Sequence, residues 1–395
     1  MSISEQAGQD DLSPQAVTTL SLMAAVSVAT GYYIQRLLTE VGGEMGLSHA
    51  LLGLLPALSQ VGFAIGLVAL LPLADSLTAR RVLLGVIPLQ IAALLLIAVS
   101  ADTAMLMVGC LLIGVAGMTP YVLPPYVSLR VSNDRLGQVT GMLTRGVNCG
   151  ILLARAAAGV IAVHLGWRAV YVVAAAAMAG VLAAVAKVVK PQIPGRRIGY
   201  GRLLASMAGI LASEPKLRTA ALCQCFNFGS FNTFWLGSTF YLGQHFGWRP
   251  DSIGYVSVLG AAAAFCAPLA GRATLRFGPH RTRAAAFALI VISWLLFAVF
   301  RESLIGMAVA LILIDLGATL QDISSRTILY TLAPDYRTRL NAVYTMAMFA
   351  GGGVSSVLVG FCWVVGGWVA ICALGGSSAA AGLAVALRRS PSNGG

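Results

Sequence analysis

Twelve long apolar stretches constrain the fold of this chain more than any other feature. They cover residues 16–38, 50–74, 82–100, 103–129, 138–163, 168–187, 217–242, 252–271, 284–300, 303–325, 340–363 and 367–387. A helix needs about 20 apolar residues to cross a bilayer, whereas a barrel strand needs about 10 of alternating polarity. These stretches do not alternate, and a chain in lipid must close its own backbone hydrogen bonds. The sequence therefore predicts an all-α polytopic membrane protein with 12 transmembrane helices.

The composition excludes the other common classes of protein. Hydrophobic residues make up 58% of the 395 residues and charged residues only 10%, against about 25% charged in a soluble domain. All seven cysteines lie inside the apolar stretches, so we interpret them as small apolar side chains and expect no metal site and no cofactor. Residues 1–15 hold three acids and no Lys or Arg, which is unlike a cleaved signal peptide.

Lys and Arg are unevenly distributed between the two sides of the predicted bundle. With a cytoplasmic N-terminus, the inner segments hold 20 of the 26 and the outer loops hold three, while Arg36, Arg145 and Arg155 lie inside helices. Positive charge concentrates on the cytoplasmic side of membrane proteins. We expect an integral protein of the bacterial inner membrane with both termini cytoplasmic. The net charge of +12 then serves contact with anionic lipid, and no nucleic acid partner is expected.

The second half of the chain repeats the first at a distance of about 200 residues, a spacing typical of parallel transporter repeats. The sequence GWRAV at 166–170 recurs as GWVAI at 367–371, and the segment 71–81 recurs at 271–281. Both members of each pair fall at the same place in a six-helix half. Parallel repeats of this kind place a solute site near the midplane, between the halves.

The repeat predicts three parts of the chain. We expect an N-terminal six-helix bundle over 1–187, a cytoplasmic central loop over 188–216, and a C-terminal six-helix bundle over 217–395. Within the central loop, Leu203–Leu211 is predicted to be amphipathic.

The segment between the second and third predicted helices reads LPLADSLTARR from Leu71 to Arg81. It resembles the G-x-L-a-D-r-x-G-r-r loop of the major facilitator superfamily of transporters, with the acid at Asp75 and the closing basic pair at Arg80 and Arg81. Both glycines are replaced. The resemblance implies a gating loop in which Asp75 latches onto a neighbouring helix, and simple anchoring of the loop by the two arginines is the alternative.

The 138–163 stretch carries small residues at Gly141, Gly150, Ala154, Ala158 and Gly159. Their spacing resembles the G-x8-G-x3-G-P-x2-G-G pattern of antiporters in the same superfamily. Small side chains allow a neighbouring helix to approach closely.

Four shorter stretches, at 32–38, 150–155, 166–168 and 337–341, are similar to a bacterial branch assigned to the export of small organic solutes. The resemblance implies the major facilitator fold, two six-helix pseudo-repeats around a central cavity, and a proton-antiporter-like mechanism.

Charged side chains within a bilayer are costly and mostly face a cavity or a partner. Arg145, Asn148 and Arg155 fall within about 80° of one another around a helix of 100° per residue, so we predict that they line the substrate cavity and bind solute oxygens. The alternative is a structural ion pair with an acid on another helix.

Asp315 lies near the middle of the 303–325 stretch, and Thr319, Asp322 and Arg326 share its face. A carboxylate removed from water holds a proton more readily, so Asp315 is the predicted proton-coupling group as well as a cavity residue. A permanent bridge from Asp315 to Arg155 or Arg145 is the alternative. Asp322 with Arg326 is predicted to form an i,i+4 pair at the inner rim.

Two further stretches supply candidate cavity residues. The first offers Tyr32, Gln35 and Arg36, although an Arg36–Glu40 pair is the simpler interpretation. The 217–242 stretch offers Asn227 and Trp235, together with Gln224 and Asn232, which could instead hydrogen-bond neighbouring helices. Pro120, Pro124 and Pro125 are expected to bend or break the 103–129 helix, because each lacks a backbone donor.

These observations predict a secondary transporter that is not an enzyme and exchanges protons for an exported small organic solute. Proton-coupled uptake of a sugar or organic acid by symport is the alternative. A membrane-embedded enzyme or receptor finds no support, because HExxH and Walker motifs are missing from the sequence. The excess of cavity arginines favours anionic or zwitterionic solutes. The expected partners are the solute, protons and membrane lipid, with the protein acting as a monomer.

Overall fold

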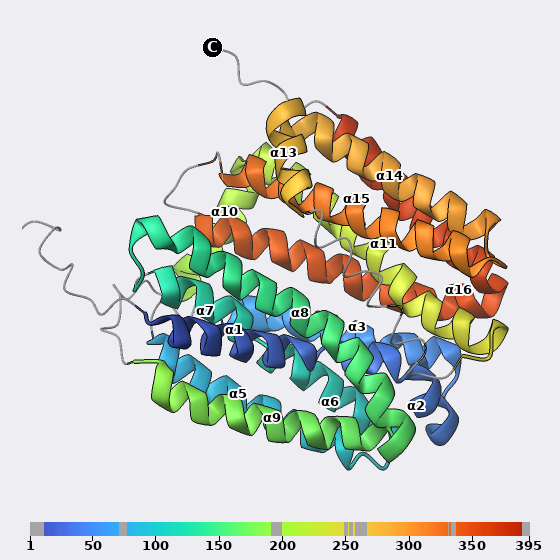
Figure 1. Cartoon of the computed structure of the whole chain (residues 1–395), viewed down its shortest axis with the longest axis horizontal. Coiled ribbons are helices and arrows are strands. Elements are labelled where there is room, and N and C mark those ends of the chain that lie inside the picture. The colour runs from blue at the N-terminus through green and yellow to red at the C-terminus, as the bar shows by residue number, and fades with distance from the viewer. Residues whose placement is uncertain are drawn as a thin grey trace, which may run out of the picture.

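A computed structural model describes residues 12–70, 77–128, 130–190, 200–248, 252, 256, 267–330, 332 and 337–388. Within these ranges every regular element is a helix. The chain forms two helical halves that lie against each other, the N-terminal half blue to green and the C-terminal half yellow to red (Figure 1). Eight of the described helices are long and apolar enough to cross a membrane, which agrees with the predicted all-α membrane fold.

The described residues of the N-terminal half form eight α-helices and one 3₁₀-helix. They are α1 (Pro14–Ala29), η2 (Tyr33–Arg36), α2 (Leu38–Met45), α3 (His49–Ala69), α5 (Ala79–Ala98), α6 (Thr103–Ala116), α7 (Thr119–Ser128), α8 (Asn133–Leu165) and α9 (Trp167–Val188).

The C-terminal half follows a connecting helix, α10 (Tyr200–Ser213), which lies inside the 188–216 segment. Its described helices are α11 (Pro215–His245), α13 (Ala267–Phe277), α14 (Pro279–Val299), α15 (Leu304–Tyr330) and α16 (Arg337–Leu387). Non-helical backbone at Gly366 and Gly367 divides α16 into two helices. Most of the predicted helix over 252–271 lies outside the described residues, and its last part, 267–271, belongs to α13.

The prediction of one helix over 16–38 is wrong, because α1 ends at Ala29. The carbonyl of Ser27 accepts a hydrogen bond at 3.1 Å from Nε2 of Gln90 on α5, so the helix end finds a partner outside the helix. A Cβ at Gly31 would lie 2.6 Å from the Phe63 ring, so this position admits no side chain. The chain then turns through η2, which places Tyr32, Gln35 and Arg36 at a break in the helix.

The expected break in the 103–129 stretch is confirmed. α6 ends at Ala116 and α7 begins at Thr119, with Pro120 in its first turn. Proline has no backbone N–H and is tolerated where a first turn would leave that donor unpaired. Pro124 and Pro125 continue within α7.

The two copies of the Gly-Trp pattern have matching local structures. Gly166 and Gly367 both have positive φ angles, 83° and 54°, a conformation that glycine adopts at low cost. The indole of Trp167 donates to Glu44 at 2.6 Å, and that of Trp368 donates to the carbonyl of Phe297 at 3.0 Å. Each copy therefore turns the chain into the last helix of its half and fixes that turn with the tryptophan.

Glu44 ties α2 to α9 at this end of the N-terminal half. Its carboxylate also pairs with Arg168, and these two partners lower the pKa of Glu44, chiefly through the hydrogen bonds that Arg168 and Trp167 donate. Arg168 further donates to the carbonyl of Ser100 at 3.0 Å. The conspicuous sequence GWR thus has a local structural role, away from the interface between the halves.

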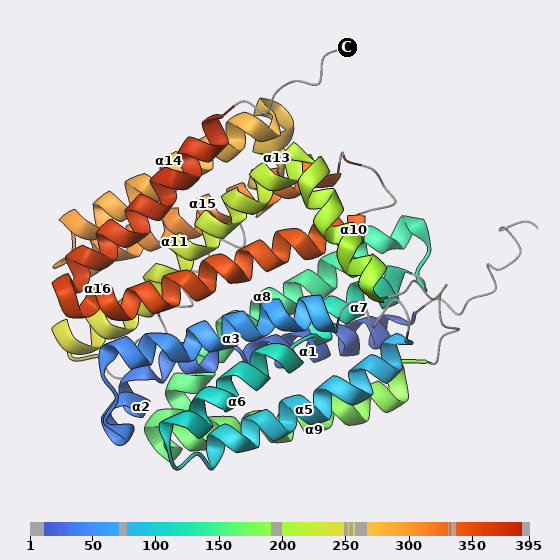
Figure 2. The same ribbon diagram turned by 180° about the vertical axis from the view of Figure 1, so that it is seen from behind.

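The two halves meet closely where α3 runs along α16 (Figure 2). A Cβ at Gly53 would lie 2.6 Å from the carbonyl of Ser356, and a Cβ at Gly360 would lie 2.7 Å from that of His49. Nearby, the His49 ring contacts the Phe240 ring edge-on at 5.2 Å. We call this end of the bundle the outer end, following the predicted orientation. The halves are in backbone contact there.

The burial of α8 changes along its length on one side of the helix. Thr144, Asn148 and Arg155 lie within about 40° of one another around the helix axis. Thr144 and Asn148, nearer the inner end, are exposed, whereas Arg155 is buried against the C-terminal half. The C-terminal half covers this face of α8 at Arg155. Two to three turns nearer the inner end, at Asn148 and Thr144, the same face is exposed. In the part of the chain that the structure describes, the interface is therefore closed at its outer end and uncovered on this side of α8 nearer the inner end.

Candidate functional site

Seven buried residues from both halves meet where η2 and α8 face α11. We call them the central cluster: Tyr32, Gln35, Arg36, Arg155, Asn232, Trp235 and Thr239. The break after α1 supplies the first three, α8 supplies Arg155, and one face of α11 supplies the last three at spacings of three and four residues.

Hydrogen bonds within the central cluster cross between the halves. Gln35 donates to Oδ1 of Asn232 at 3.2 Å and accepts from Nη2 of Arg155 at 3.4 Å. Nη1 of Arg36 donates to Oγ1 of Thr239 at 3.2 Å. The bonds to Asn232 and Thr239 cross between the halves and must break if the halves separate, whereas the Arg155–Gln35 bond stays within the N-terminal half.

Two guanidinium groups lie against the same indole ring. Cζ of Arg155 is 4.1 Å from the ring centroid of Trp235, and Cζ of Arg36 is 5.0 Å from it. Both arginines are almost fully buried, at 2% and 1% exposure. Cation–π contact with a tryptophan contributes about 0.5–2 kcal/mol, which is well below the several kcal/mol that burying each charge costs.

The guanidinium groups of Arg36 and Arg155 lack an acidic partner within 4.0 Å among the described residues. Nε and Nη2 of Arg36 and Nε of Arg155 are buried without a hydrogen-bond acceptor. The expected Arg36–Glu40 pair is not formed, because Arg36 turns to Thr239 while Glu40 accepts from Thr39. Two positive charges are thus held together without a counter-ion.

Asp315 on α15 is the carboxylate that the charge of Arg155 affects across the interface. The two groups lie beyond ion-pair distance, so the bridge from Asp315 to Arg155 that the sequence left open is not formed. Asp315 is 6% exposed and its Oδ2 has no hydrogen-bond partner. Among the described residues, the acid therefore has no basic partner that would keep it ionised.

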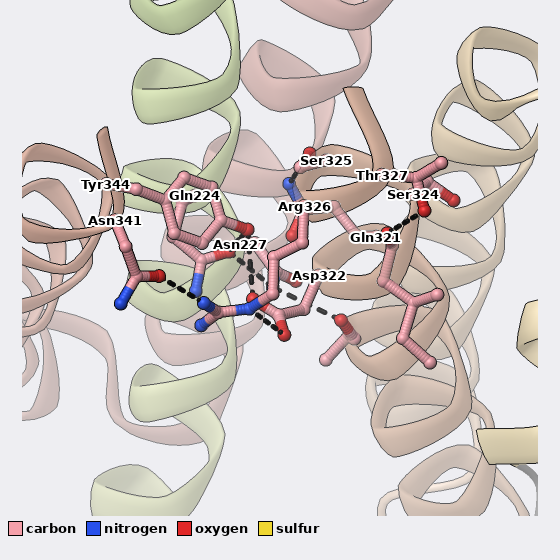
Figure 3. A network of polar contacts seen from close by, with 12 residues as sticks. Gln224, Asn227, Gln321, Asp322, Ser324, Ser325, Arg326, Thr327, Asn341 and Tyr344 are labelled. Carbon is pink, nitrogen blue, oxygen red and sulfur yellow. Dashed lines mark hydrogen bonds and ion pairs between the residues drawn. The ribbon is translucent and has the colours of Figure 1, made fainter. Parts of the chain in front are cut away.

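A second polar network lies nearer the inner end of the C-terminal half (Figure 3). Arg326 pairs with Asp322 at 2.9 Å, which confirms the predicted i,i+4 pair, and donates to Asn341 at 2.6 Å. The hydroxyl of Tyr344 reaches Asp322 at 2.9 Å and Gln224 at 2.8 Å. In contrast to Asp315, the acid of this network is fully partnered.

Five of the predicted cavity residues meet in the central cluster, and the others do not. Asn227 joins the second network, where it donates to Oε1 of Gln224 at 3.4 Å. Arg145 and Asn148 are exposed on the inner half of α8, away from Arg155. The spacing of the helix put these residues near one face, but their separation along the axis keeps them out of the cluster.

The predicted gating loop is only partly described. Asp75 lies outside the described residues. Arg80 donates to the carbonyl of Ala186 at 3.3 Å, which ties the start of α5 to the end of α9, and Arg81 lies on the exposed side of the same turn. The contact of Arg80 fits the anchoring alternative for that residue.

Sequence reasoning missed one member of the central cluster, Thr239. Thr239 is one of many hydroxyl residues in apolar helices, so nothing in its local sequence marks it. Asn232 was visible as an amide in an apolar stretch, and its Nδ2 donates to Ser355 and Ser356 on α16, both at 2.9 Å. These bonds fix the amide so that its oxygen faces Gln35.

The fold and the position of the cluster define a transporter built from two like halves. A family model of the Major Facilitator Superfamily matches residues 19–215 and 220–395, so the chain belongs to this superfamily and is a secondary transporter.

Its relatives carry names that state transport without a solute. It is 31% identical over 376 residues, 95% of each chain, to the putative uncharacterized transporter YgaY of Escherichia coli K12. It is 30% identical over 368 residues, 91% of this chain and 84% of the relative, to the probable transporter SCO4007 of Streptomyces coelicolor.

Solved structures share the fold at low sequence identity. The peptide transporter POT, as a variant in complex with sulfate, is 14% identical and has a TM-score of 0.78 over 98% of this chain and 97% of its own. The nucleoside transporter NupG is 12% identical, with a TM-score of 0.74 over 95% and 100%. A bacterial homologue of the lysosomal transporter Spinster is 15% identical, with a TM-score of 0.70 over 94% and 93%.

Proposed function

We propose that this protein transports a small organic solute across the bacterial inner membrane in exchange or in company with protons, and that Asp315 carries the proton. The halves would rock about the central cluster so that it opens to one side at a time. The closed outer end and the uncovered inner part of α8 support this alternating access.

The observation that carries the proposal is the isolation of Asp315. A carboxylate that is buried without a partner is costly, whereas its protonated form is not. Asp322, two turns along the same face of α15 towards the inner end, is held by Arg326 and Tyr344 and is unsuited to gain and lose a proton. Asp315 and Asp322 are the only acids within the twelve apolar stretches.

Two directions of transport are consistent with this role. The antiporter-like pattern of α8 favours export, and one of its glycines lies in a close contact: a Cβ at Gly150 would lie 2.4 Å from Ala25 on α1, whereas a Cβ at Gly141 would have no neighbour within 4 Å. The unpaired charge of the central cluster favours uptake by symport. The protein exports the solute if proton and solute exclude each other, and takes it up if the two bind together.

Exchanging Asp315 for asparagine is expected to abolish proton-driven solute movement while the protein still folds. Membrane vesicles of both orientations would be supplied with a uniformly labelled metabolite extract, with and without an imposed pH gradient, and their contents read by mass spectrometry. Wild-type protein should move at least one solute in a gradient-dependent manner, and the Asp315→Asn variant should lose that dependence because its amide cannot bind and release a proton.

The matched control is Glu302→Gln, which removes an acid from an exposed outer loop. It should keep the gradient dependence. Unchanged gradient-driven transport by the Asp315→Asn variant would remove the proton role assigned to this residue.

A further inference from the structure

The free edge of the Arg36 guanidinium has the geometry of a carboxylate-binding fork. Nη1 of Arg36 is used by Thr239, whereas Nε and Nη2, the two donors that point the same way along one edge, are buried and unpartnered. Parallel N–H groups of this kind bind both oxygens of a carboxylate or phosphate at once.

A second positive charge lies beside this fork. Arg155 shares the Trp235 ring with Arg36 and has its own free Nε. The charge of Arg155 acts unfavourably on Arg36, so the pair costs free energy without a ligand. Asp315 is the one acid whose charge acts on Arg155 among the described residues, and one carboxylate cannot balance two guanidinium groups.

Other charges do not neutralise this excess. The elements packed against α15 are α11, α13, α14 and α16, and their charged or titratable basic groups lie towards the helix ends. These groups are Lys216, Arg218, His245, Arg272, Arg276, His280, Arg281, Arg283 and Arg339. All are basic, and Asp322 is occupied by Arg326. The excess positive charge of the central cluster is therefore left for a ligand.

We propose that the central cluster binds the carboxylate or phosphate group of a small organic acid through Arg36 and Arg155, and that this acid is carried together with the proton on Asp315. The inference rests on the proposed function and gives it a solute class and a direction. In a cell whose proton gradient points inward, this transport is uptake by symport.

Charge alone determines whether the proton and the solute favour or oppose each other's binding. A bound anion and an ionised Asp315 are like charges near the same guanidinium, so each weakens the binding of the other. Protonation of Asp315 removes that repulsion and leaves Arg155 to the solute. By linkage, the anion raises the proton affinity of Asp315 to the same degree. Proton and acid therefore bind in the same conformation, whereas a cationic solute would compete with the proton.

Binding can be tested with probes that differ only in charge. Purified protein would be heated with two series of probes, each made of an acid, a neutral analogue and a cationic analogue. The first series is gluconate, glucose and glucosamine, and the second is benzoate, benzamide and benzylamine. Inorganic phosphate is tested separately, and all samples have equal ionic strength. We expect the organic acids to raise the unfolding temperature, more at pH 5.5 than at pH 8, and the neutral and cationic analogues to leave it unchanged. Stabilisation by phosphate alone would assign the site to inorganic phosphate and overturn the organic acid.

Variants separate the site from general salt effects. Arg36→Lys and Arg155→Lys keep the charge but lose the fork. Each should raise at least tenfold the acid concentration that gives half of the shift in unfolding temperature. Arg218→Lys is the matched control at an exposed position on α11 and should keep the shift. Asp315→Asn should keep the shift and lose its pH dependence. A shift that survives both fork variants, or no shift with any acid, would overturn the proposal.

Transport distinguishes this inference from the broader function. In proteoliposomes that contain a pH dye, external gluconate should acidify the lumen with wild-type protein and not with Asp315→Asn. Acidification driven by glucose instead would sustain proton coupling and overturn the acid as solute. Binding of gluconate without proton movement would sustain the anion site and overturn the role of the proton.

Discussion

Exchanging Arg155 for methionine is expected to slow transport strongly without lowering the thermal stability of the protein. A hydrogen bond to a charged group contributes about 1.5–3 kcal/mol, so removing the guanidinium should slow transport of an acidic solute by about 10- to 150-fold. Methionine has similar length and fits an apolar pocket.

The stability part of this prediction follows from the missing counter-ion. Burial of an unpaired charge costs several kcal/mol, whereas Arg155 regains one hydrogen bond of 3.4 Å and contacts with Trp235 and Tyr32. The cost exceeds the gain, so the unfolding temperature of Arg155→Met should be unchanged or higher. Binding sites commonly lower stability in this way.

Arg326→Met provides the comparison, because Arg326 is paired with Asp322 and Asn341. Its removal takes the ion-pair partner from Asp322 and a hydrogen-bond donor from Asn341. It should cost about 1–3 kcal/mol, measured as a lower unfolding temperature. An equal fall for Arg155→Met would show that Arg155 holds the fold together rather than binding a ligand.

Exchanging Gly360 for valine is expected to open the outer end of the protein. A Cβ there would lie 2.7 Å from the His49 carbonyl and 3.1 Å from Cα of Ala50, so valine cannot be accommodated unless α3 and α16 move apart. Overpacking costs about 1–3 kcal/mol, which changes the ratio of closed to open states about 5- to 150-fold.

This change can be read by cross-linking across the interface. Nε2 of His49 and Nε2 of Gln244 lie 3.2 Å apart on opposite halves, so a bismaleimide reagent should join cysteines at these two positions readily in the otherwise native protein and poorly with Gly360→Val. Gly180→Val is the control, because a Cβ at Gly180 has no neighbour within 4 Å. Equal cross-linking in all three proteins would contradict a closed outer end that opens during transport.

The positions of the helices could be predicted from sequence because lipid imposes one rule on every apolar stretch. Each must be a helix, so length and hydropathy suffice. The rule fails at residues 30–37, where η2 replaces the expected helix. Its cause is the packing of Gly31 on Phe63 and the hydrogen bonds from Gln90, which are contacts between segments and leave no local signal.

The site could be predicted only in part, because it too depends on contacts between distant segments. Tyr32, Gln35, Arg36, Arg155 and Trp235 were recognised as polar or aromatic groups in apolar helices, and they meet in the structure. Which of them touch depends on how far along the axis the halves overlap. Helix periodicity gives the face of a residue and not its depth relative to another helix, so the separation of Arg145 from Arg155 was not predicted.

The central claim is that one face of α8 lines a water-filled gap between the halves. Its most direct test is the labelling of a cysteine introduced at Asn148, in a Cys149→Ala background, by a membrane-impermeant thiol reagent. Asn148 lies on the face of Arg155, and Leu153, on the opposite side of α8, is 67% exposed. Asn148→Cys should react from the cytoplasmic side and Leu153→Cys should not, because lipid covers it. Equal reaction at both positions, or none at Asn148→Cys, would contradict the claim.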